Sequence, residues 1–247
     1  DGDGKLDIIF NSIWGKVQWL KNIGTKEGLD FAKAQNIPVD WSSKYSKMPK
    51  GATLWDKKFV APKPLWNWWN PEADMFVTQW RTTPVVIDWN KDGIQDIVSL
   101  DHEGYLAFYE GFKVKNVHWL KPGKRIFACE NGSRYTHKNQ VLDAAPGLLQ
   151  LNAGEAGASG RRKLCFVDWD GDGDLDLIAN SKNAEWFENT GTRDGITHFV
   201  NRGDLSPVKL AGHSTCPTPV DWDKDGIFDL LLGAEDGHFY RINNTRK

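Results

Sequence analysis

The sequence predicts an all-β fold built from a repeated unit of short antiparallel strands. Three observations support this prediction. An aspartate-rich nonapeptide recurs along the chain, short apolar runs flank its copies, and a further strand-like segment follows each copy. Apolar runs of this length, bounded by turn residues, are typical of buried strands. Because the whole unit recurs, a repeat architecture is indicated.

The nonapeptide occurs in three full copies and one shortened copy. These are Asp88-Trp-Asn-Lys-Asp-Gly-Ile-Gln-Asp96, Asp168-Trp-Asp-Gly-Asp-Gly-Asp-Leu-Asp176, Asp221-Trp-Asp-Lys-Asp-Gly-Ile-Phe-Asp229 and Asp1-Gly-Asp-Gly-Lys-Leu-Asp7. Side-chain oxygens stand at positions one, three, five and nine, and glycine stands at position six; the shortened copy lacks position one. Ca²⁺ accepts several oxygen ligands in flexible geometry, whereas Mg²⁺ keeps more of its water. The motif therefore predicts calcium loops.

We expect one structural Ca²⁺ per loop, held by the side chains at these positions. The expected ligands are Asp1, Asp3, Asp7, Asp88, Asn90, Asp92, Asp96, Asp168, Asp170, Asp172, Asp176, Asp221, Asp223, Asp225 and Asp229. The helical calcium-binding hand closes instead with a glutamate at position 12. Here that position holds Ser99, Ala179 or Leu232, so the unit is strand, loop, strand.

Each repeat also contains later strand-like segments. Apolar runs at 85–87 and 97–98 flank the second loop, and runs at 164–167 and 177–178 flank the third. A third strand is predicted at 16–22, 104–109, 184–189 and 237–243, with the same turn after two of them, at 23–25 and 190–192. A fourth strand is predicted at 30–37, 124–129 and 196–201. Four antiparallel strands per repeat are typical of a propeller blade.

On these motifs the chain resembles the FG-GAP or VCBS type of calcium-binding β-propeller repeat. Such repeats are found in integrin heads and in secreted bacterial proteins that act on polysaccharides, including lyases of rhamnogalacturonan or ulvan. The resemblance implies four-stranded antiparallel blades arranged in a ring. It is specific for the fold and says less about the function.

The expected domain is a single partial propeller over residues 1–247. The central glycines Gly4, Gly93, Gly173 and Gly226 are 89, 80 and 53 residues apart, so the first two gaps hold blade-to-blade insertions at about 40–83 and 133–160. The first loop begins without its inner strand, which favours about four blades of a six- to eight-bladed ring. The missing N-terminal half of the propeller is then an expected partner.

Composition argues against several classes of protein. The formal net charge of −2 gives no case for a nucleic-acid partner, and no apolar run approaches the roughly 18 residues of a membrane-spanning helix. Three cysteines are too few for a disulfide framework, and we expect Cys165 to be a packed thiol. Calcium loops suit a compartment rich in calcium, so the expected location is extracellular, periplasmic or at the cell surface.

Thirteen tryptophans form two main groups. Those at loop position two or on third strands are expected to pack within blades; they are Trp19, Trp89, Trp169, Trp186 and Trp222. Another group lies in the first insertion and comprises Trp41, Trp55, Trp66, Trp68, Trp69 and Trp80. Because indole faces stack on sugar rings, Trp66, Trp68, Trp69 and Trp80 are predicted to bind a polysaccharide. The alternative is a small satellite core of the insertion.

Arginines recur at one position of the repeat. Arg81 and Arg161 each stand seven residues before the first aspartate of a loop. Guanidinium groups suit carboxylate or sulfate, so Arg81, Arg161, Arg162 and Arg134 are predicted to bind an acidic, uronate-containing polysaccharide. The alternative is that these arginines tether loops or pair with local acids.

Strand direction predicts which end of the blades binds the ligand. The calcium loops join first to second strands, whereas the insertions join blade to blade and lie on the opposite face, together with the turns joining second to third strands. Long loops on a rigid scaffold commonly carry function. The metals are accordingly expected to be structural.

Three functions fit this pattern. By resemblance, the leading enzymatic one is a polysaccharide lyase, in which a histidine or tyrosine removes the proton beside a uronate carboxylate and a positive group neutralises that carboxylate. The candidate catalytic residues are His137, Tyr135, His102 and His213; a hydrolase using paired carboxylates is an open alternative. The other two functions are a non-catalytic carbohydrate-binding module and an integrin-like platform for a protein partner.

Overall fold

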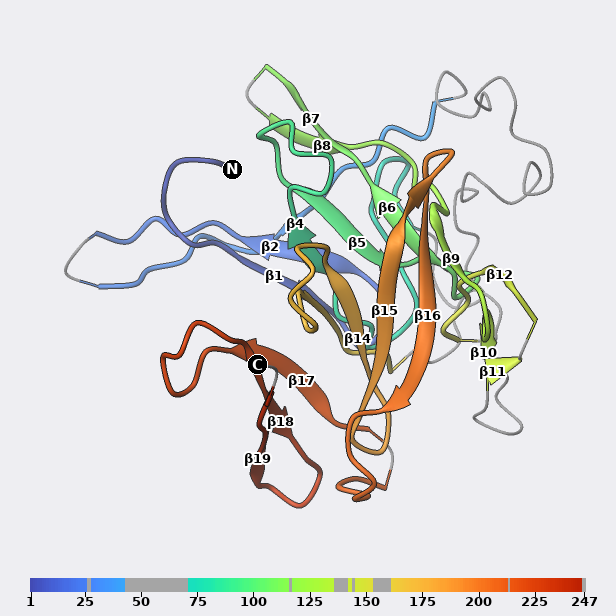
Figure 1. The fold of residues 1–247 in the computed structure, drawn as a ribbon. Coiled ribbons are helices and arrows are strands. Elements are labelled where there is room, and N and C mark those ends of the chain that lie inside the picture. The colour runs from blue at the N-terminus through green and yellow to red at the C-terminus, as the bar shows by residue number, and fades with distance from the viewer. Residues whose placement is uncertain are drawn as a thin grey trace. The chain divides into compact units, whose positions relative to one another are not determined.

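The described part of the chain is built from strands and turns. In the computed structural model it comprises residues 1–25, 28–42, 71–115, 117–135, 142–143, 145–152, 161–212 and 214–245. These residues contain strands β1 to β19 and no helix (Figure 1), which confirms the all-β prediction. None of them belongs to a helix long and apolar enough to cross a membrane.

The chain divides into two compact units. One contains Asp1–Ile126 and Gln150–Gly160, and the other contains Phe127–Leu149 and Arg161–Lys247. The first and second acidic loops belong to the first unit, and the third and fourth belong to the second.

The first unit contains two three-stranded antiparallel sheets and a hairpin. Its strands are β1 (Ile8–Asn11), β2 (Val17–Leu20) and β3 (Gln35–Asn36) in one sheet, β4 (Val85–Ile87), β5 (Asp96–Leu100) and β6 (Leu106–Tyr109) in the next, and β7 (Gly111–Val114) with β8 (Val117–Leu120) in the hairpin. Each sheet therefore runs in chain order, and an acidic loop joins β4 to β5.

The core of the first unit combines residues from both sheets with the end of the first insertion. Val17, Ile97 and Tyr109 are buried together with Phe76, whose ring lies 4.5 Å from that of Tyr109. Strand β5 is buried at all five residues. Trp19 and Trp41 pack against this cluster. Trp19 thus packs as predicted, and Trp41 packs on this same core.

The second unit contains a six-stranded sheet in the order β12-β9-β16-β15-β14-β13. Its strands are β13 (Leu164–Val167), β14 (Asp176–Asn180), β15 (Ala184–Arg193), β16 (Ile196–Asp204), β9 (Phe127–Cys129) and β12 (Gly147–Leu148). Strands β13 to β16 form an antiparallel four-stranded meander. Strands β10 (Arg134–Tyr135) and β11 (Leu142–Asp143) form a separate small pair.

A three-stranded sheet completes the second unit. Strands β17 (Cys216–Val220), β18 (Asp229–Gly233) and β19 (Phe239–Ile242) pair in chain order. Leu230 and Leu232 pack with Ile178 and Trp169 in one buried cluster.

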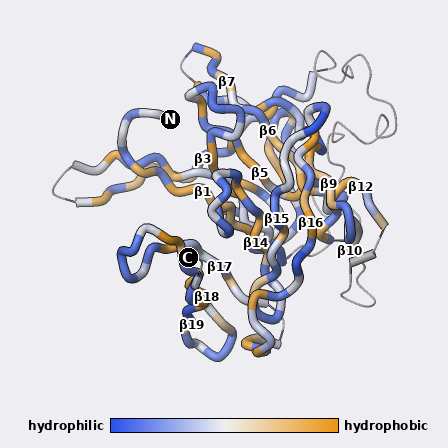
Figure 2. Tube along the Cα trace, in the orientation of Figure 1, coloured by the Kyte–Doolittle hydropathy of each residue, from blue (hydrophilic) through white to orange (hydrophobic). Residues whose placement is uncertain are grey.

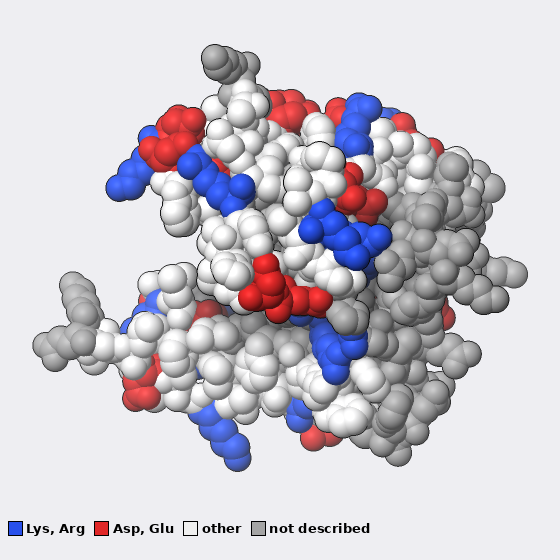
Figure 3. Space-filling model, turned by 90° about the horizontal axis from the view of Figure 1, so that it is seen from below, with Lys and Arg blue, Asp and Glu red and all other residues white. Residues whose placement is uncertain are grey.

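Hydrophobic residues concentrate on the strands of each unit (Figure 2). On the face drawn in Figure 3, basic and acidic side chains lie interspersed in small groups, in keeping with the net charge of −2.

Two strand predictions were wrong in their details. The segment 124–129 was predicted to be the fourth strand of its own repeat. Lys124 bridges to Phe108 on the third strand of that repeat, but Phe127–Cys129 pairs in parallel with β16 of the next repeat. The turn expected at 190–192 is instead an irregularity inside β15, and the chain reverses at Asp194–Gly195. Both residues there have positive φ, 52° and 76°, as a two-residue type I′ hairpin requires.

The tryptophans at position two of the loops differ in burial. Trp169 is 7% exposed and packs as predicted. Trp222, at the same position of the fourth loop, is 56% exposed, so the packing prediction was wrong for this residue. Trp169 packs against Leu230 and Leu232 of the β17–β19 sheet.

Candidate functional site

The four acidic loops adopt one backbone conformation. Position six is a glycine with φ between 84° and 94° in every loop, at Gly4, Gly93, Gly173 and Gly226. Position four is also left-handed, at Gly2, Lys91, Gly171 and Lys224, with φ between 59° and 83°. A left-handed conformation costs a lysine roughly 1–2 kcal/mol more than a right-handed one. Retention of this geometry at Lys91 and Lys224 shows that the surrounding loop imposes it.

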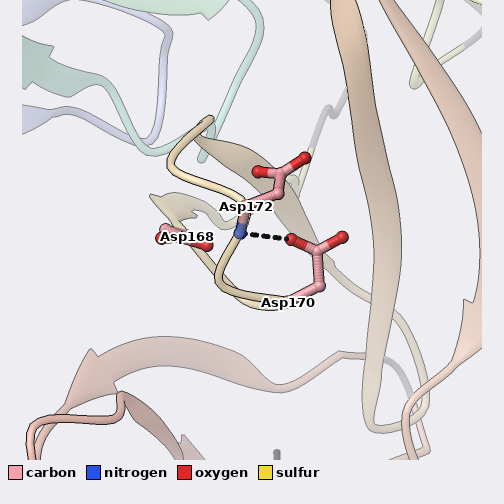
Figure 4. A group of neighbouring side chains, drawn as sticks. All are labelled: Asp168, Asp170 and Asp172. Carbon is pink, nitrogen blue, oxygen red and sulfur yellow. Dashed lines mark hydrogen bonds between the residues drawn. The ribbon is translucent and has the colours of Figure 1, made fainter.

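The odd positions of the loops bring carboxylates together. Asp168, Asp170 and Asp172 lie around one turn (Figure 4), and one oxygen from each lies within 4.8 Å of the others. The backbone N–H of Asp172 donates to Asp170 Oδ1 at 3.2 Å. The side chains of Asp221, Asp223 and Asp225 form an equivalent triad. Closely spaced anionic oxygens are the donor set that hard cations prefer.

Position nine is a carboxylate that ties the loop to a backbone N–H within the third strand or just after it. Asp96, Asp176 and Asp229 are at most 2% exposed. In all four loops its Oδ1 accepts a backbone N–H at 2.7–2.9 Å; the pairs are Asp7 with Asn22, Asp96 with Gly111, Asp176 with Asn189 and Asp229 with Asn244. The other oxygen of Asp176 accepts the N–H of Trp169 at 3.1 Å.

Burial makes the ionised form of these carboxylates unfavourable. It raises the pKa of Asp176 to about 6, against the opposing effect of the Asn189 N–H, and it raises the pKa of Asp96. A nearby divalent cation favours ionised carboxylates. The residues at positions one, three and five of the third and fourth loops therefore fit an oxygen-preferring cation.

Individual loops differ in their protein partners. In the fourth loop, the Arg241 guanidinium pairs with Asp223 and lies 2.7 Å from Asp229 Oδ2. Asp221 Oδ1 in the same loop is buried and has no hydrogen-bond partner among the described residues. In the first loop, Lys21 pairs with Asp1 and lies 3.3 Å from Asp3. In the second loop, the amide of Asn90 replaces a carboxylate and donates to Asp92 Oδ2 at 3.0 Å.

Two segments that carry predicted site residues meet at the other end of the sheet β4-β5-β6. Trp80 and Arg81 follow Gln79, whose Nε2 donates to the carbonyl of His102 at 3.3 Å. Asn152 Nδ2 donates to Gln79 Oε1 at 2.6 Å. The acidic loop joins β4 to β5, and the His102 turn joins β5 to β6. The two therefore lie at opposite ends of one antiparallel sheet.

Arg81 occupies a constrained turn. Its φ is 57°, and Arg161, at the same position of the next repeat, has φ 46°. Asn11 Nδ2 donates to the carbonyls of Gln79 and Thr82, both at 2.9 Å, and so clamps the backbone on either side of Arg81. The repeated left-handed conformation confirms that the two arginines are equivalent. Strain of this kind persists where the surroundings impose it, and it clusters at functional sites.

Arg162 is positioned as a tether. It is 6% exposed, and its Nη1 donates to the Asn180 carbonyl at 2.9 Å. Asn180 Nδ2 in turn donates to the Arg161 carbonyl at 3.1 Å. These bonds favour the alternative that Arg162 fixes a loop.

His102 is a buried, neutral histidine. It is 8% exposed, and burial lowers its pKa against the opposing effect of Asp101. Its Nδ1 is buried without a hydrogen-bond partner within the described ranges.

An ion pair beneath the His102 turn holds it in place. Arg125, 1% exposed, donates from Nε to Asp101 Oδ2 at 2.6 Å and from Nη2 to Glu103 Oε2 at 2.7 Å. The guanidinium also lies 4.2 Å from the centre of the Tyr105 ring. Sequence reasoning missed Arg125, since an arginine outside the motifs carries no signal of burial.

Other predicted site residues are not positioned by the structure. Those outside the described residues are His137, His213, Trp66, Trp68 and Trp69. Arg134 and Tyr135 form β10, with only their backbone described.

Sequence reasoning also missed Trp14, which is 48% exposed and contacts Trp80. Its signal was its place in the turn Ser12-Ile-Trp-Gly-Lys16, which resembles Asp101-His-Glu-Gly-Tyr105.

Comparison with known families identifies the repeat. Residues 168–232 match the FG-GAP-like repeat. The match begins at the first aspartate of the third loop and ends in β18, so it spans two acidic loops and strands β14 to β17 between them. No curated protein matches the chain. The molecule is therefore an all-β protein that carries an FG-GAP-like repeat.

Proposed function

We propose that this chain is part of a secreted, calcium-stabilised β-propeller that binds an acidic polysaccharide. The FG-GAP-like repeat and the four-stranded antiparallel meander β13 to β16 support a propeller blade as the building unit. On this proposal, about four blades of a six- to eight-bladed ring are present, and the location is extracellular, periplasmic or at the cell surface.

Calcium has a structural role in this proposal. The acidic side chains at loop positions one, three and five converge, and the buried aspartate at position nine links each loop to its third strand. A cation held there would fix the hairpin of the first two strands. The acidic loop of the β4-β5-β6 sheet lies at one end of that sheet, and Trp80 and Arg81 lie at the other end. A cation in the loop would therefore not contact the polysaccharide.

The observation that carries the binding proposal is the meeting of the Trp80–Arg81 turn with the His102 turn. An indole, a guanidinium and an imidazole come from two segments that are fixed by side-chain hydrogen bonds. Aromatic faces suit sugar rings, and guanidinium groups suit carboxylates. The proposed polysaccharide contacts are Trp80, Arg81 and Arg161. Arg161 belongs to the next repeat, where Arg162 supports it.

Binding can be measured by calorimetry with polygalacturonate and with a neutral polysaccharide as control. The proposal predicts saturable binding of the acidic polymer and weaker binding by Arg81→Gln. Arg241→Gln is a matched control, because Arg241 pairs with an acidic loop. If neither polymer binds, the protein does not act on polysaccharide of this kind, and an integrin-like protein-interaction role takes its place.

A lyase activity is the second candidate, and His102 is the observation that favours it. Burial lowers the pKa of this histidine and so favours the neutral imidazole, the form that a base removing the proton beside a uronate carboxylate requires. Incubation with uronate polymers should then increase the ultraviolet absorbance of the unsaturated product, and His102→Gln should abolish the increase. Binding without any such increase would identify a non-catalytic carbohydrate-binding module.

A further inference from the structure

We infer that the exposed indole of Trp14, supported by Trp80, forms an aromatic platform for a pyranose ring. The inference rests on the proposed polysaccharide function and adds a specific contact residue to it. Trp14 lies in the turn between β1 and β2, and Trp80 lies near the end of the first insertion. Their ring centroids are 5.3 Å apart, and the ring planes meet at 82°.

The turn that carries Trp14 is rigid. Ser12 Oγ accepts the backbone N–H groups of Trp14 at 3.2 Å and Lys16 at 3.1 Å. The N–H of Ser12 donates to the Lys16 carbonyl at 2.8 Å. Gly15 has φ 84°, a conformation that glycine adopts without strain. Little backbone entropy would therefore be lost when a ligand contacts this turn.

Buried backbone contacts join the Trp14 turn to the Trp80 segment. The N–H of Thr78 donates to the Gly15 carbonyl at 2.9 Å, and Lys16 bridges to Val77. Val77 and Thr78 have no exposed surface. Trp80 packs on the buried pair Met75 and Val77. The two indoles are consequently held in a fixed relationship by the fold.

The turn itself does not require a tryptophan. Equivalent turns occur at Asp101-His-Glu-Gly-Tyr105 and Ala234-Glu-Asp-Gly-His238, with φ of 86° at Gly104 and 84° at Gly237. Trp14 is the third residue of its turn. The third residue of the other two turns is Glu103 or Asp236, whose side chains are 44% and 42% exposed. Since acidic residues satisfy the same geometry, the turn does not account for an indole at this corner. What distinguishes Trp14 is its pairing with a second indole, that of Trp80.

The chemistry of the pair indicates a sugar ring. An edge-to-face arrangement braces one indole against another and keeps Trp14 48% exposed. The negative π-face of an indole attracts the weakly positive C–H groups on one side of a pyranose. Arg81 directly follows Trp80 in the sequence, so a uronate ring on the platform would have a guanidinium in the adjoining turn.

The test compares Trp14→Ala with Trp222→Ala in the full chain. Trp222 is a matched control because it is 56% exposed and lies beside an acidic loop. Calorimetry with an oligogalacturonate should show binding weakened about tenfold or more by Trp14→Ala, the range of a central aromatic contact. Binding by Trp222→Ala should equal that of the unchanged protein. Trp14→Phe should retain most of the affinity, and thermal unfolding confirms that each variant is folded.

The outcomes separate this inference from the function on which it rests. If the unchanged protein binds the oligosaccharide and Trp14→Ala binds equally well, the platform is refuted and the proposed function stands. If only a neutral oligosaccharide binds and Trp14→Ala weakens that binding, the platform stands and the preference for acidic glycans fails. If the unchanged protein binds no oligosaccharide, both are overturned.

Discussion

Asp176 accepts the backbone N–H of Asn189 at 2.7 Å and so joins the end of the third acidic loop to the middle of strand β15. The same bond recurs in the other three repeats. In the third repeat the loop is thereby connected to β13, β14 and β15. Any cation in the loop should therefore stabilise the whole sheet.

The first prediction concerns the carboxylate of Asp176. Its replacement in Asp176→Asn removes a buried anionic acceptor and should lower the free energy of unfolding by about 1.5–3 kcal/mol in calcium, the usual value of a charged hydrogen bond. Urea denaturation measures this change. Asp174→Asn makes the same chemical change at an exposed residue of the same loop and should shift the free energy by no more than about 0.5 kcal/mol. Equal effects of the two substitutions would contradict the proposed link.

The second prediction concerns pH in the absence of calcium. Burial raises the pKa of Asp176 to about 6 from 3.8, so the folded state binds a proton more tightly than the unfolded state does. The resulting stability is fully present below about pH 4 and is lost as the pH rises through 6. In a chelator, the urea midpoint of the unchanged protein should fall more between pH 4 and pH 7 than that of Asp176→Asn. Parallel profiles for the two proteins would show that this carboxyl group is not responsible.

The third prediction concerns the buried ion pair of Arg125 and Asp101. Arg125→Met leaves the Asp101 carboxylate buried without its partner, which typically costs about 3–5 kcal/mol of folding stability. Lys124→Met is the matched control, since Lys124 pairs with Glu110 near the surface and such pairs contribute about 0–1 kcal/mol. Chemical denaturation of both variants checks the prediction. A loss below about 1 kcal/mol for Arg125→Met would mean that the pair does not hold the His102 turn.

The fourth prediction concerns the cysteines. Burial raises the pKa of Cys165 to about 12 and also raises the pKa of Cys129, whereas Cys216 is exposed. Because the thiolate is the reactive form, iodoacetamide at pH 8 should label Cys216 in the folded protein and leave the other two thiols intact. All three should react in urea. Mass spectrometry of peptides locates the label, and rapid labelling of Cys165 in the folded protein would contradict its buried position.

Local patterns allowed the metal-loop hairpins to be predicted. The strands at 85–87, 97–98, 164–167 and 177–178 were correctly placed because aspartates, glycine and flanking apolar residues lie within one short segment. The partner of Phe127–Cys129 was not predictable in the same way. Its pairing with β16 joins residues about 70 positions apart, and apolar sequence specifies a strand without specifying its neighbour.

The candidate site was predictable only in part. The equivalence of Arg81 and Arg161 followed from their spacing, and the left-handed φ of both confirms it. Trp14 and Arg125 were missed because their roles depend on contacts with Trp80 and Asp101, which lie far from them in the chain. Trp222 shares its motif position with Trp169, but the motif does not reveal whether another sheet covers it.

The most direct test of the central claim is calcium titration of the chain, followed by calorimetry and thermal unfolding. The acidic loops predict saturable Ca²⁺ binding that Mg²⁺ does not reproduce. At about 100 times the dissociation constant, calcium should add about 2.7 kcal/mol of stability per site. Asp168→Asn combined with Asp172→Asn should remove one site. An unchanged unfolding temperature in calcium and in chelator, with no binding heat, would contradict the account.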